Sequence, residues 1–301
     1  MISSTNFSFA MMWLACPSGR TSDKKRIGIK SINPPTDSLT MISFTLFFSL
    51  LAAGLLEVFI PILLGLWLWT KLKTKWIYFL IGAALWFIAY LVRIPLNTSG
   101  TVWIFNNFSG ATLIYLGIAF PSLTAGIFEE SARWLAFRFM IKDHKLENGL
   151  MYGAGHGGIE SILLVGVSVL STGISAYFYP QMLSAAQLAS IAAMPEWIAF
   201  IGLWERLTAI TFHIAMSVLV LESFREKQIW YLGVAIGAHF FLNFAAVYAS
   251  QWGIIQSELV VTAFAAVSLW YLWLTWKNDK ATASKAPAAQ VPETHTPPTS
   301  A

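Results

Sequence analysis

The sequence predicts an all-α protein, a polytopic bundle of about seven transmembrane helices. Of its residues, 56% are hydrophobic and only 11% are charged, and the mean hydropathy is +0.63. Soluble domains carry about a quarter charged residues, so a water-soluble fold could not hide this much apolar surface. Seven apolar runs are long enough to cross a hydrocarbon core, which needs about 20 helical residues. They lie near residues 43–69, 76–95, 111–138, 150–171, 197–222, 229–249 and 255–276.

Basic residues alternate between the connections and so predict the topology. They follow the first, third, fifth and seventh runs, as Lys71, Lys73, Lys75, Arg138, Lys142, Lys145, Arg225, Lys227, Lys277 and Lys280. The connections near 96–110, 172–196 and 250–254 contain no Lys or Arg. The positive-inside rule therefore places the N-terminus of the first span outside and the C-terminal tail in the cytoplasm. The connection at 172–196 holds two prolines and is expected to be a loop or a short interfacial helix.

Three regions are expected along the chain. Residues 41–276 form the transmembrane domain, and residues 277–301, rich in Ala, Pro and Thr, form a disordered tail. Residues 1–40 carry a basic cluster on the outer side, and their apolar stretch suits neither a span nor a signal peptide. Met41 stands directly before the first strong helix, so we expect it to be the true start; N-terminal sequencing of the native protein tests this.

Composition also limits the partners. The single Cys16 excludes a disulfide framework and a cysteine-based metal site. The formal net charge of +4 is small and the basic residues act as topology signals, so we expect no nucleic-acid partner. The lipid bilayer is the partner that the composition does require.

Ionisable residues lie inside the predicted spans, where they are costly and usually functional. The third span carries Glu129, Glu130 and Arg133; the fourth His156 and Glu160; the fifth Glu205, Arg206 and His213; the sixth His239 and Asn243. At a rise of 1.5 Å per residue, Glu129, His156, His213 and His239 each fall roughly 9–18 Å from the cytoplasmic end of their span. Four helices thus offer polar groups at one level, which predicts a shared polar cavity opening toward the cytoplasm.

Helical spacing places several of these groups on common faces. Pairs four or seven residues apart share one side of a helix. They are His156 with Glu160, His239 with Asn243, Arg206 with His213, and Glu129 with Arg133. Glycines beside His156 would let a neighbouring backbone or a substrate approach closely. These are Gly153, Gly155, Gly157 and Gly158.

Two chemistries could use this set. A glutamate beside a water molecule can act as a general base in hydrolysis, with a histidine and an amide stabilising the oxyanion. Alternatively, two or three histidines and a glutamate could hold Zn²⁺ and leave a position for water. The HExxH string of many zinc proteases is absent, and no serine stands in an obvious nucleophile setting.

The order and spacing of these motifs resemble the YhfC-type family of intramembrane metalloproteases. That group is similar to the CAAX prenyl endopeptidases and bacteriocin-processing proteins (CPBP) and to the PrsW-like proteases. The shared marks are EExxxR, FxxxH and HxxxN, and they stand here as Glu129-Glu130 with Arg133, as Tyr152 to His156, and as His239 to Asn243. The first motif is one residue shorter than the CAAX form, and Tyr replaces Phe in the second. Arg206 and His213 resemble a further motif of the PrsW-like branch.

The resemblance implies hydrolysis of a peptide bond in or near a bacterial plasma membrane. By analogy, Glu129 or Glu130 activates water with the help of His156. His239 and Asn243 then bind the oxyanion, or His239 joins His156 and His213 as a metal ligand. The substrate implied is a membrane-embedded or membrane-proximal peptide or protein, which need not be prenylated.

Other readings use the same residues differently. Buried Glu, His and Arg could line a proton-coupled or metal-ion transport path, although no convincing inverted repeat is present. A non-catalytic immunity or receptor-like membrane protein could also keep the fold. Glu205 with Arg206 is more simply a structural ion pair, and His213 a structural histidine. Glu57 and Arg93 match no motif and receive no role.

Overall fold

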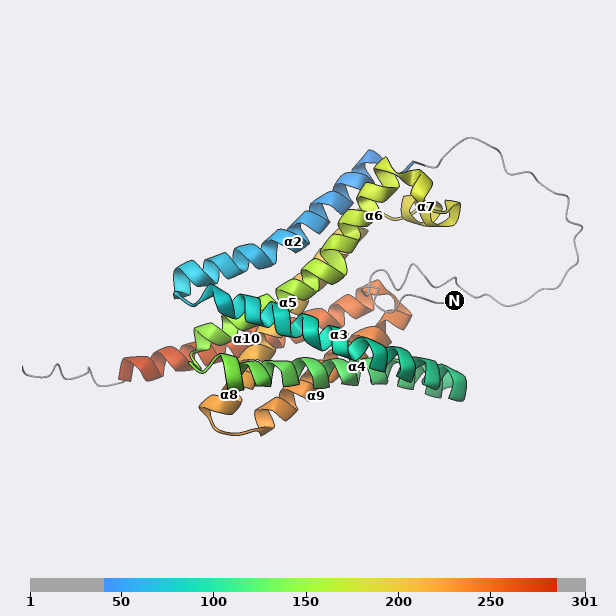
Figure 1. Cartoon of the computed structure of the whole chain (residues 1–301). Helices are drawn as coiled ribbons and strands as arrows, with labels where there is room; N and C mark the ends of the chain where they lie inside the picture. Colours follow the sequence, from blue (N-terminus) through green and yellow to red (C-terminus); the bar gives the residue numbers. More distant parts are fainter. Residues whose placement is uncertain (1–40, 286–301) are drawn as a thin grey trace, which may run out of the picture.

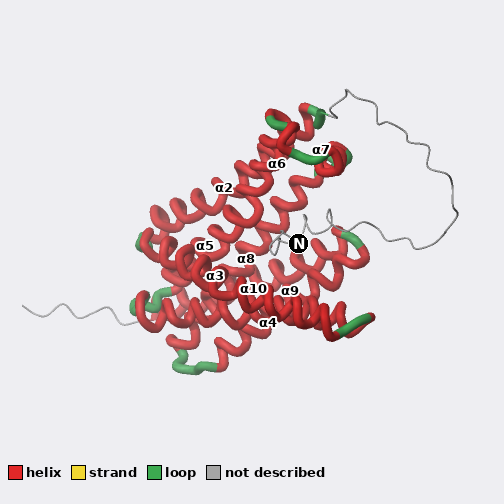
Figure 2. Tube along the Cα trace, turned by 45° about the vertical axis from the view of Figure 1, so that its right-hand side comes forward, coloured by secondary structure: helices red, strands yellow, loops and turns green. Residues whose placement is uncertain are grey.

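The computed structural model describes residues 41–285, and this part of the chain is helical without strands (Figures 1 and 2). Its α-helices are α2 (Phe44–Leu72), α3 (Trp76–Asn107), α4 (Gly110–Leu135), α5 (Leu146–Glu160), α6 (Val167–Phe178), α7 (Ala185–Ala192), α8 (Ile198–Arg225), α9 (Trp230–Ala249) and α10 (Ile254–Lys285). Short π-helical segments, η2 (Ala136–Met140) and η3 (Ser161–Gly166), continue α4 and join α5 to α6. The 3-10 turns are η4 (Pro180–Met182) and η5 (Ser250–Trp252).

Seven helical segments of the described chain are long and apolar enough to cross a membrane, which confirms the predicted fold class. They are Phe44–Leu72, Trp76–Asn107, Gly110–Met140, Leu146–Phe178, Ile198–Arg225, Trp230–Trp252 and Ile254–Thr282. Large apolar side chains cover their outer faces; Leu259 is 65% exposed and Trp270 is 61% exposed. An exposed apolar surface on this scale is unfavourable in water and favourable in lipid, so the chain is an integral membrane protein.

Two connections differ from the simple pattern of apolar runs. The second span was expected to end near residue 95, but α3 continues through Pro95 to Asn107. In a bilayer a helix satisfies its own backbone hydrogen bonds, so continuing past one proline is better than exposing an irregular loop. The connection at 172–196 contains the short helix α7, whose first turn is closed by a capping box between Ser184 and Gln187.

The predicted domain boundaries near the two chain ends can be compared with the structure only in part. The tail was expected from residue 277, but α10 remains helical to Lys285. Residues 277–285 are therefore a correction to that boundary: the helical pattern of the last span persists after its apolar run ends. The predicted start at Met41, with residues 1–40 before it, and the remainder of the tail at 286–301 lie outside the described residues.

Helices α5 and α8 occupy the centre of the bundle. In the most apolar stretch of α8, 67% of the residues are buried, against 11% in α10. Helix α5 packs against α3, α8 and α2, while α8 also contacts α10, α9 and α4. The polar residues carried by α5 and α8 are consequently removed from lipid on every side.

Glycines allow α5 to approach its neighbours at backbone distance. A Cβ atom added to Gly155 would lie 2.0 Å from the carbonyl oxygen of Phe79 on α3. One added to Gly153 would lie 2.6 Å from the Cα of Ile214 on α8. These separations leave no room for any side chain, so the glycines set the distances between the three helices. Since His156 directly follows Gly155 in the sequence, the same packing fixes the position of its ring.

We expect Gly155→Ala to destabilise the protein, because the new methyl group would collide with a backbone carbonyl that cannot rotate away. Overpacking of this kind costs about 1–3 kcal/mol. Thermal unfolding in detergent, followed by size-exclusion chromatography, measures the effect. Gly233→Ala on α9 is the matched control, because a Cβ there meets nothing within 4 Å. Equal stability of the two variants would contradict the packing described for α5.

Candidate active site

The predicted site residues on α4, α5, α8 and α9 come together in the bundle interior. Helix α4 reaches α9 through Gly126, where an added Cβ would lie 2.7 Å from the carbonyl oxygen of Ile236. This close crossing brings Glu129 and Glu130, one turn further along α4, beside His239 on α9. The ring of His213 on α8 lies 5.1 Å from the His156 ring and 5.4 Å from the His239 ring, between centroids. Three histidines from three helices therefore surround one pair of glutamates.

Glu129 is placed between positive and imidazole groups. Its Oε1 lies 3.2 Å from a guanidinium nitrogen of Arg93 on α3, and its Oε2 lies 3.2 Å from Nε2 of His156. The Nε2 of His239 stands 3.9 Å from the same Oε2. Two polar atoms at that separation can share one water molecule at hydrogen-bonding distance from both. Glu129 thus has one oxygen held by an arginine and one oxygen turned toward two histidines.

Glu130 is held in a different way, by direct bonds to both of its oxygens. Arg133 donates from Nη1 to Oε1 and Oε2 at 2.9 and 3.0 Å, and His239 Nδ1 lies 2.7 Å from Oε1. Glu130 and Arg133 are both fully buried. A carboxylate that accepts from a histidine Nδ1 fixes the ring orientation and leaves Nε2 for other work. Glu130 therefore aims His239 Nε2 at Glu129.

The pairing of Arg133 departs from the helical spacing used above. The four-residue interval suggested that Arg133 holds Glu129, but Arg133 holds Glu130, three residues away. Arg93 takes the place beside Glu129. No motif contains Arg93, but its position in an apolar span could have marked it as a site residue. An arginine there must pair with a carboxylate or extend to the membrane interface.

His213 links the glutamate pair to a second ion-pair group. Its Nδ1 lies 2.7 Å from Nη2 of Arg133, and its Nε2 lies 2.8 Å from Oε2 of Glu160. Because a guanidinium can only donate, His213 Nδ1 accepts that bond and Nε2 carries the proton toward Glu160. Glu160 also accepts from Arg206 and Trp86, at 3.0 and 3.1 Å. The expected common face of Arg206 and His213 is thus confirmed by their shared partner.

Further carboxylates lie beyond Arg206. Arg206 forms an ion pair with its neighbour Glu205, as the structural interpretation of that pair expected. Glu57 on α2, 1% exposed, has neither carboxylate oxygen hydrogen-bonded within the described part of the chain. Glu258 on α10 is 7% exposed, and its Oε2 is likewise without a hydrogen-bond partner among the described residues. Glu57 and Glu258 were not assigned to the site from the sequence, and with Glu205 they extend its polar interior across α2, α8 and α10.

Asn243 is the least engaged of the predicted site residues. It follows His239 by one helical turn on α9 and is half-buried. Within residues 41–285 its side chain makes no hydrogen bond with the protein. Its amide is consequently free to bind another group one helical turn from His239.

One subset of these residues has the donors for a metal ion. Single ligand atoms of Glu129, His156 and His213 lie within 4.8 Å of one another, and all three residues are buried. One carboxylate and two imidazoles are a donor set that catalytic zinc uses. Nδ1 of His156 is buried without a partner in the described structure, which leaves that nitrogen open to a ligand. The residues therefore fit zinc, although a metal on His213 would replace its contact with Arg133 or Glu160.

Comparison with known proteins gives two independent matches. A protein-family model described as YhfC intramembrane metalloprotease matches residues 56–265, which contain all four helices that carry the site. The uncharacterized membrane protein YhfC of Bacillus subtilis (strain 168) is 31% identical over 249 residues, covering 73% of this chain and 92% of that protein. No solved structure matches the chain. The extent of both matches shows that the chain belongs to the YhfC intramembrane metalloprotease family.

Proposed function

We propose that this protein is an intramembrane endopeptidase in which Glu129 activates water for attack on a peptide carbonyl. The observation that carries the proposal is the position of Glu129 Oε2, 3.2 Å from Nε2 of His156 and 3.9 Å from Nε2 of His239. A water held there would face a carboxylate that can take its proton and two imidazoles that can orient it. The family match supports hydrolysis of peptide bonds over ion transport.

The two glutamates have separate roles in this mechanism. Glu130 is a positioning residue, because both of its oxygens are occupied by Arg133 and its Oε1 also by His239. Glu129 keeps one oxygen directed at the proposed water. During attack, Glu129 accepts the proton of the water while His156 holds the carboxylate in place. The same proton then passes to the departing amine, so that no covalent intermediate is needed.

The negative charge that develops on the peptide oxygen needs donors. In our proposal two groups one helical turn apart on α9 face the substrate: the Asn243 amide donates, and His239 Nε2 donates when its ring carries both protons, since Nδ1–H is held by Glu130. Preorganised donors of this kind lower the barrier because they need no rearrangement when the charge forms. Arg93, with its side chain 13% exposed, adds positive potential beside Glu129.

A metal ion is compatible with the same residues. Glu129, His156 and His213 would hold zinc, which when bound would polarise the peptide carbonyl and activate water; Glu129 would then serve as a ligand in place of its role as base. His239, outside that group of three, keeps its role through Glu130. If the metal took His213 Nε2, Arg133 would keep its hydrogen bond to Nδ1; if the metal took Nδ1, that hydrogen bond would be lost.

We further propose that the site opens toward the cytoplasm of a plasma membrane and acts on a peptide at or within the bilayer. The C-terminal ends of α2 and α10 both lie at the left of Figure 1, and the basic residues at these ends support the cytoplasmic assignment of that side.

We expect Glu129→Gln to abolish peptide cleavage, with a fall of about 10²–10⁴-fold, because the amide cannot accept the proton of water. New N-termini would be counted by mass spectrometry in membranes of cells that produce each variant. Glu130→Gln should lower thermal stability as well, since it leaves Arg133 buried beside a neutral partner. Glu226→Gln, an exposed residue outside the site, is the control. Cleavage that persists in Glu129→Gln would rule out the assigned base.

We expect zinc in chelator-free, detergent-purified protein, and its loss in His156→Ala and His213→Ala. Plasma emission spectrometry gives the zinc-to-protein ratio for each variant. His144→Ala, in the loop after η2, should retain the metal because His144 lies outside the group of three. Folded wild-type protein without zinc would contradict the metal site and leave water activation to Glu129 with His156.

A further inference from the structure

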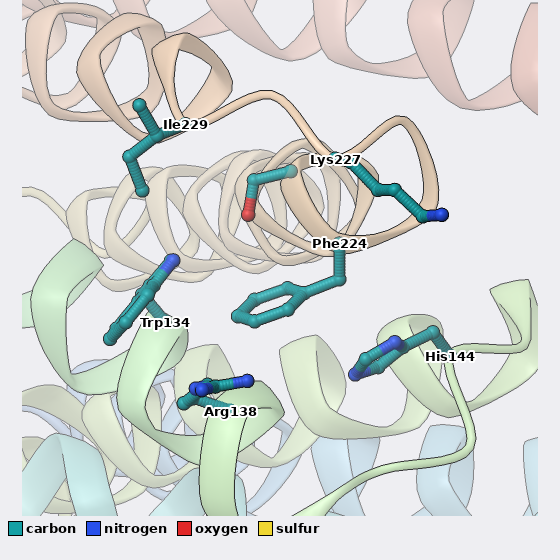
Figure 3. Close-up of a pocket in the computed structure, with 7 residues that line it drawn as sticks. Trp134, Arg138, His144, Phe224, Lys227 and Ile229 are labelled. Atoms are coloured by element: carbon teal, nitrogen blue, oxygen red, sulfur yellow. The ribbon is translucent and has the colours of Figure 1, made fainter.

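A second cavity lies away from the catalytic residues, at the end of the bundle that carries the basic loops. It has a volume of about 510 Å³ and is lined by Trp134, Arg138, His144, Ser223, Phe224, Lys227 and Ile229. Sites for small ligands commonly have about 300–1,000 Å³. Figure 3 shows the Phe224 ring between the side chains of Trp134, Arg138 and His144. The lining includes two permanent cations and no carboxylate.

The charge of this cavity is not compensated by the protein. Two other cations at the same end are paired: Lys145 with Asp143 at 3.1 Å, and Arg225 with Glu222 and Asp279. Arg138 and Lys227 form no ion pair within residues 41–285. The Arg138 guanidinium carbon lies over the Phe139 ring, 6.0 Å from its centroid. These two cations are therefore available to an anion.

The remaining walls supply a polar edge and an apolar floor. Trp134 and Arg138 are one turn apart and line the cavity together, and the Trp134 indole nitrogen has no hydrogen-bond partner in the described structure. His144 donates from Nε2 to the carbonyl oxygen of Phe137, 3.0 Å away, which leaves Nδ1 for the cavity. Phe224 and Ile229 provide apolar contact. A ligand with an anionic head and an apolar body matches these walls.

We propose that this cavity binds the phosphate group of an anionic phospholipid, with Arg138 and Lys227 as its cationic partners. A guanidinium can hold two phosphate oxygens at once, and an ammonium adds a point charge. Basic pockets between transmembrane helices at the cytoplasmic side bind anionic headgroups for this reason. A free phosphate offers the same oxygens, but only the lipid also uses Phe224 and Ile229. The site is independent of the proposed catalytic roles.

Backbone geometry provides a variant that removes charge without strain. Lys227 lies in the left-handed region with φ of 56°, and Lys73, at the end of α2, has the same φ. Glycine is favoured at such positions, so Lys227→Gly and Lys73→Gly each remove one ammonium and relax the backbone. Lys73 does not line the cavity. The two variants are thus matched in charge, chemistry and backbone, and differ only in place.

The test uses the full chain in detergent, with phosphatidylglycerol or phosphatidylcholine added and bound lipid counted by native mass spectrometry. We expect Lys227→Gly and Arg138→Gln each to weaken phosphatidylglycerol binding about fivefold, the contribution of one basic residue near an anionic surface. Lys73→Gly should bind as wild type, and phosphatidylcholine should bind weakly to all.

Three results would overturn the proposal. Equal losses in Lys227→Gly and Lys73→Gly would mean that bulk charge at this end attracts the lipid. Unchanged binding in both Arg138→Gln and Lys227→Gly would remove the site. Inorganic phosphate that displaces phosphatidylglycerol at comparable concentration would assign the cavity to a soluble phosphate compound.

Discussion

The interaction on which the site depends is the set of ion pairs that joins Glu129 and Glu130 to Arg93 and Arg133 inside the bundle. Charges taken out of water cost several kcal/mol each unless partners of opposite sign and further hydrogen bonds replace the lost hydration. Each glutamate here has an arginine on one side and a histidine on another. The pairs consequently fix the rotamers of the histidines, and through them the space where a substrate would meet the proposed water.

The backbone makes this arrangement possible through close packing. Gly153 and Gly155 bring α5 against α8 and α3 at distances that exclude a side chain, and Gly126 does the same for α4 against α9. Helices held this closely cannot shift without breaking backbone contacts, because lipid offers no substitute for them. The proposed catalytic groups therefore lie on rigid helices. The cavity at the basic end lies where the end of α4 and η2 meet the end of α8 and the α8–α9 connection.

Much of the architecture follows from the sequence because burial in lipid leaves a simple signature. Seven apolar runs predict seven spans, and the intramembrane residues His156, His213 and His239 predict a shared interior site. The partner of each charge is less predictable, because helices can rotate and slide relative to one another. Arg133 was therefore matched to Glu129 by spacing, although the crossing of α4 with α3 delivers Arg93 to that carboxylate. The prediction ended the second span at Pro95 because the residues after it are polar and resemble a loop, but α3 continues beyond Pro95.

The energetics of the buried network argue for function. A buried ion-pair group can often be replaced by apolar residues of similar volume with no loss of stability, or with a gain of about 1–4 kcal/mol. An all-apolar interior would therefore hold these helices together at least as well. The network instead places Arg133 and Arg206 between carboxylates and histidines, where every member restricts the next. Groups held in this way need to move little when charge develops in a transition state, which lowers the activation barrier. That lower barrier can offset the free energy that burying the charges costs.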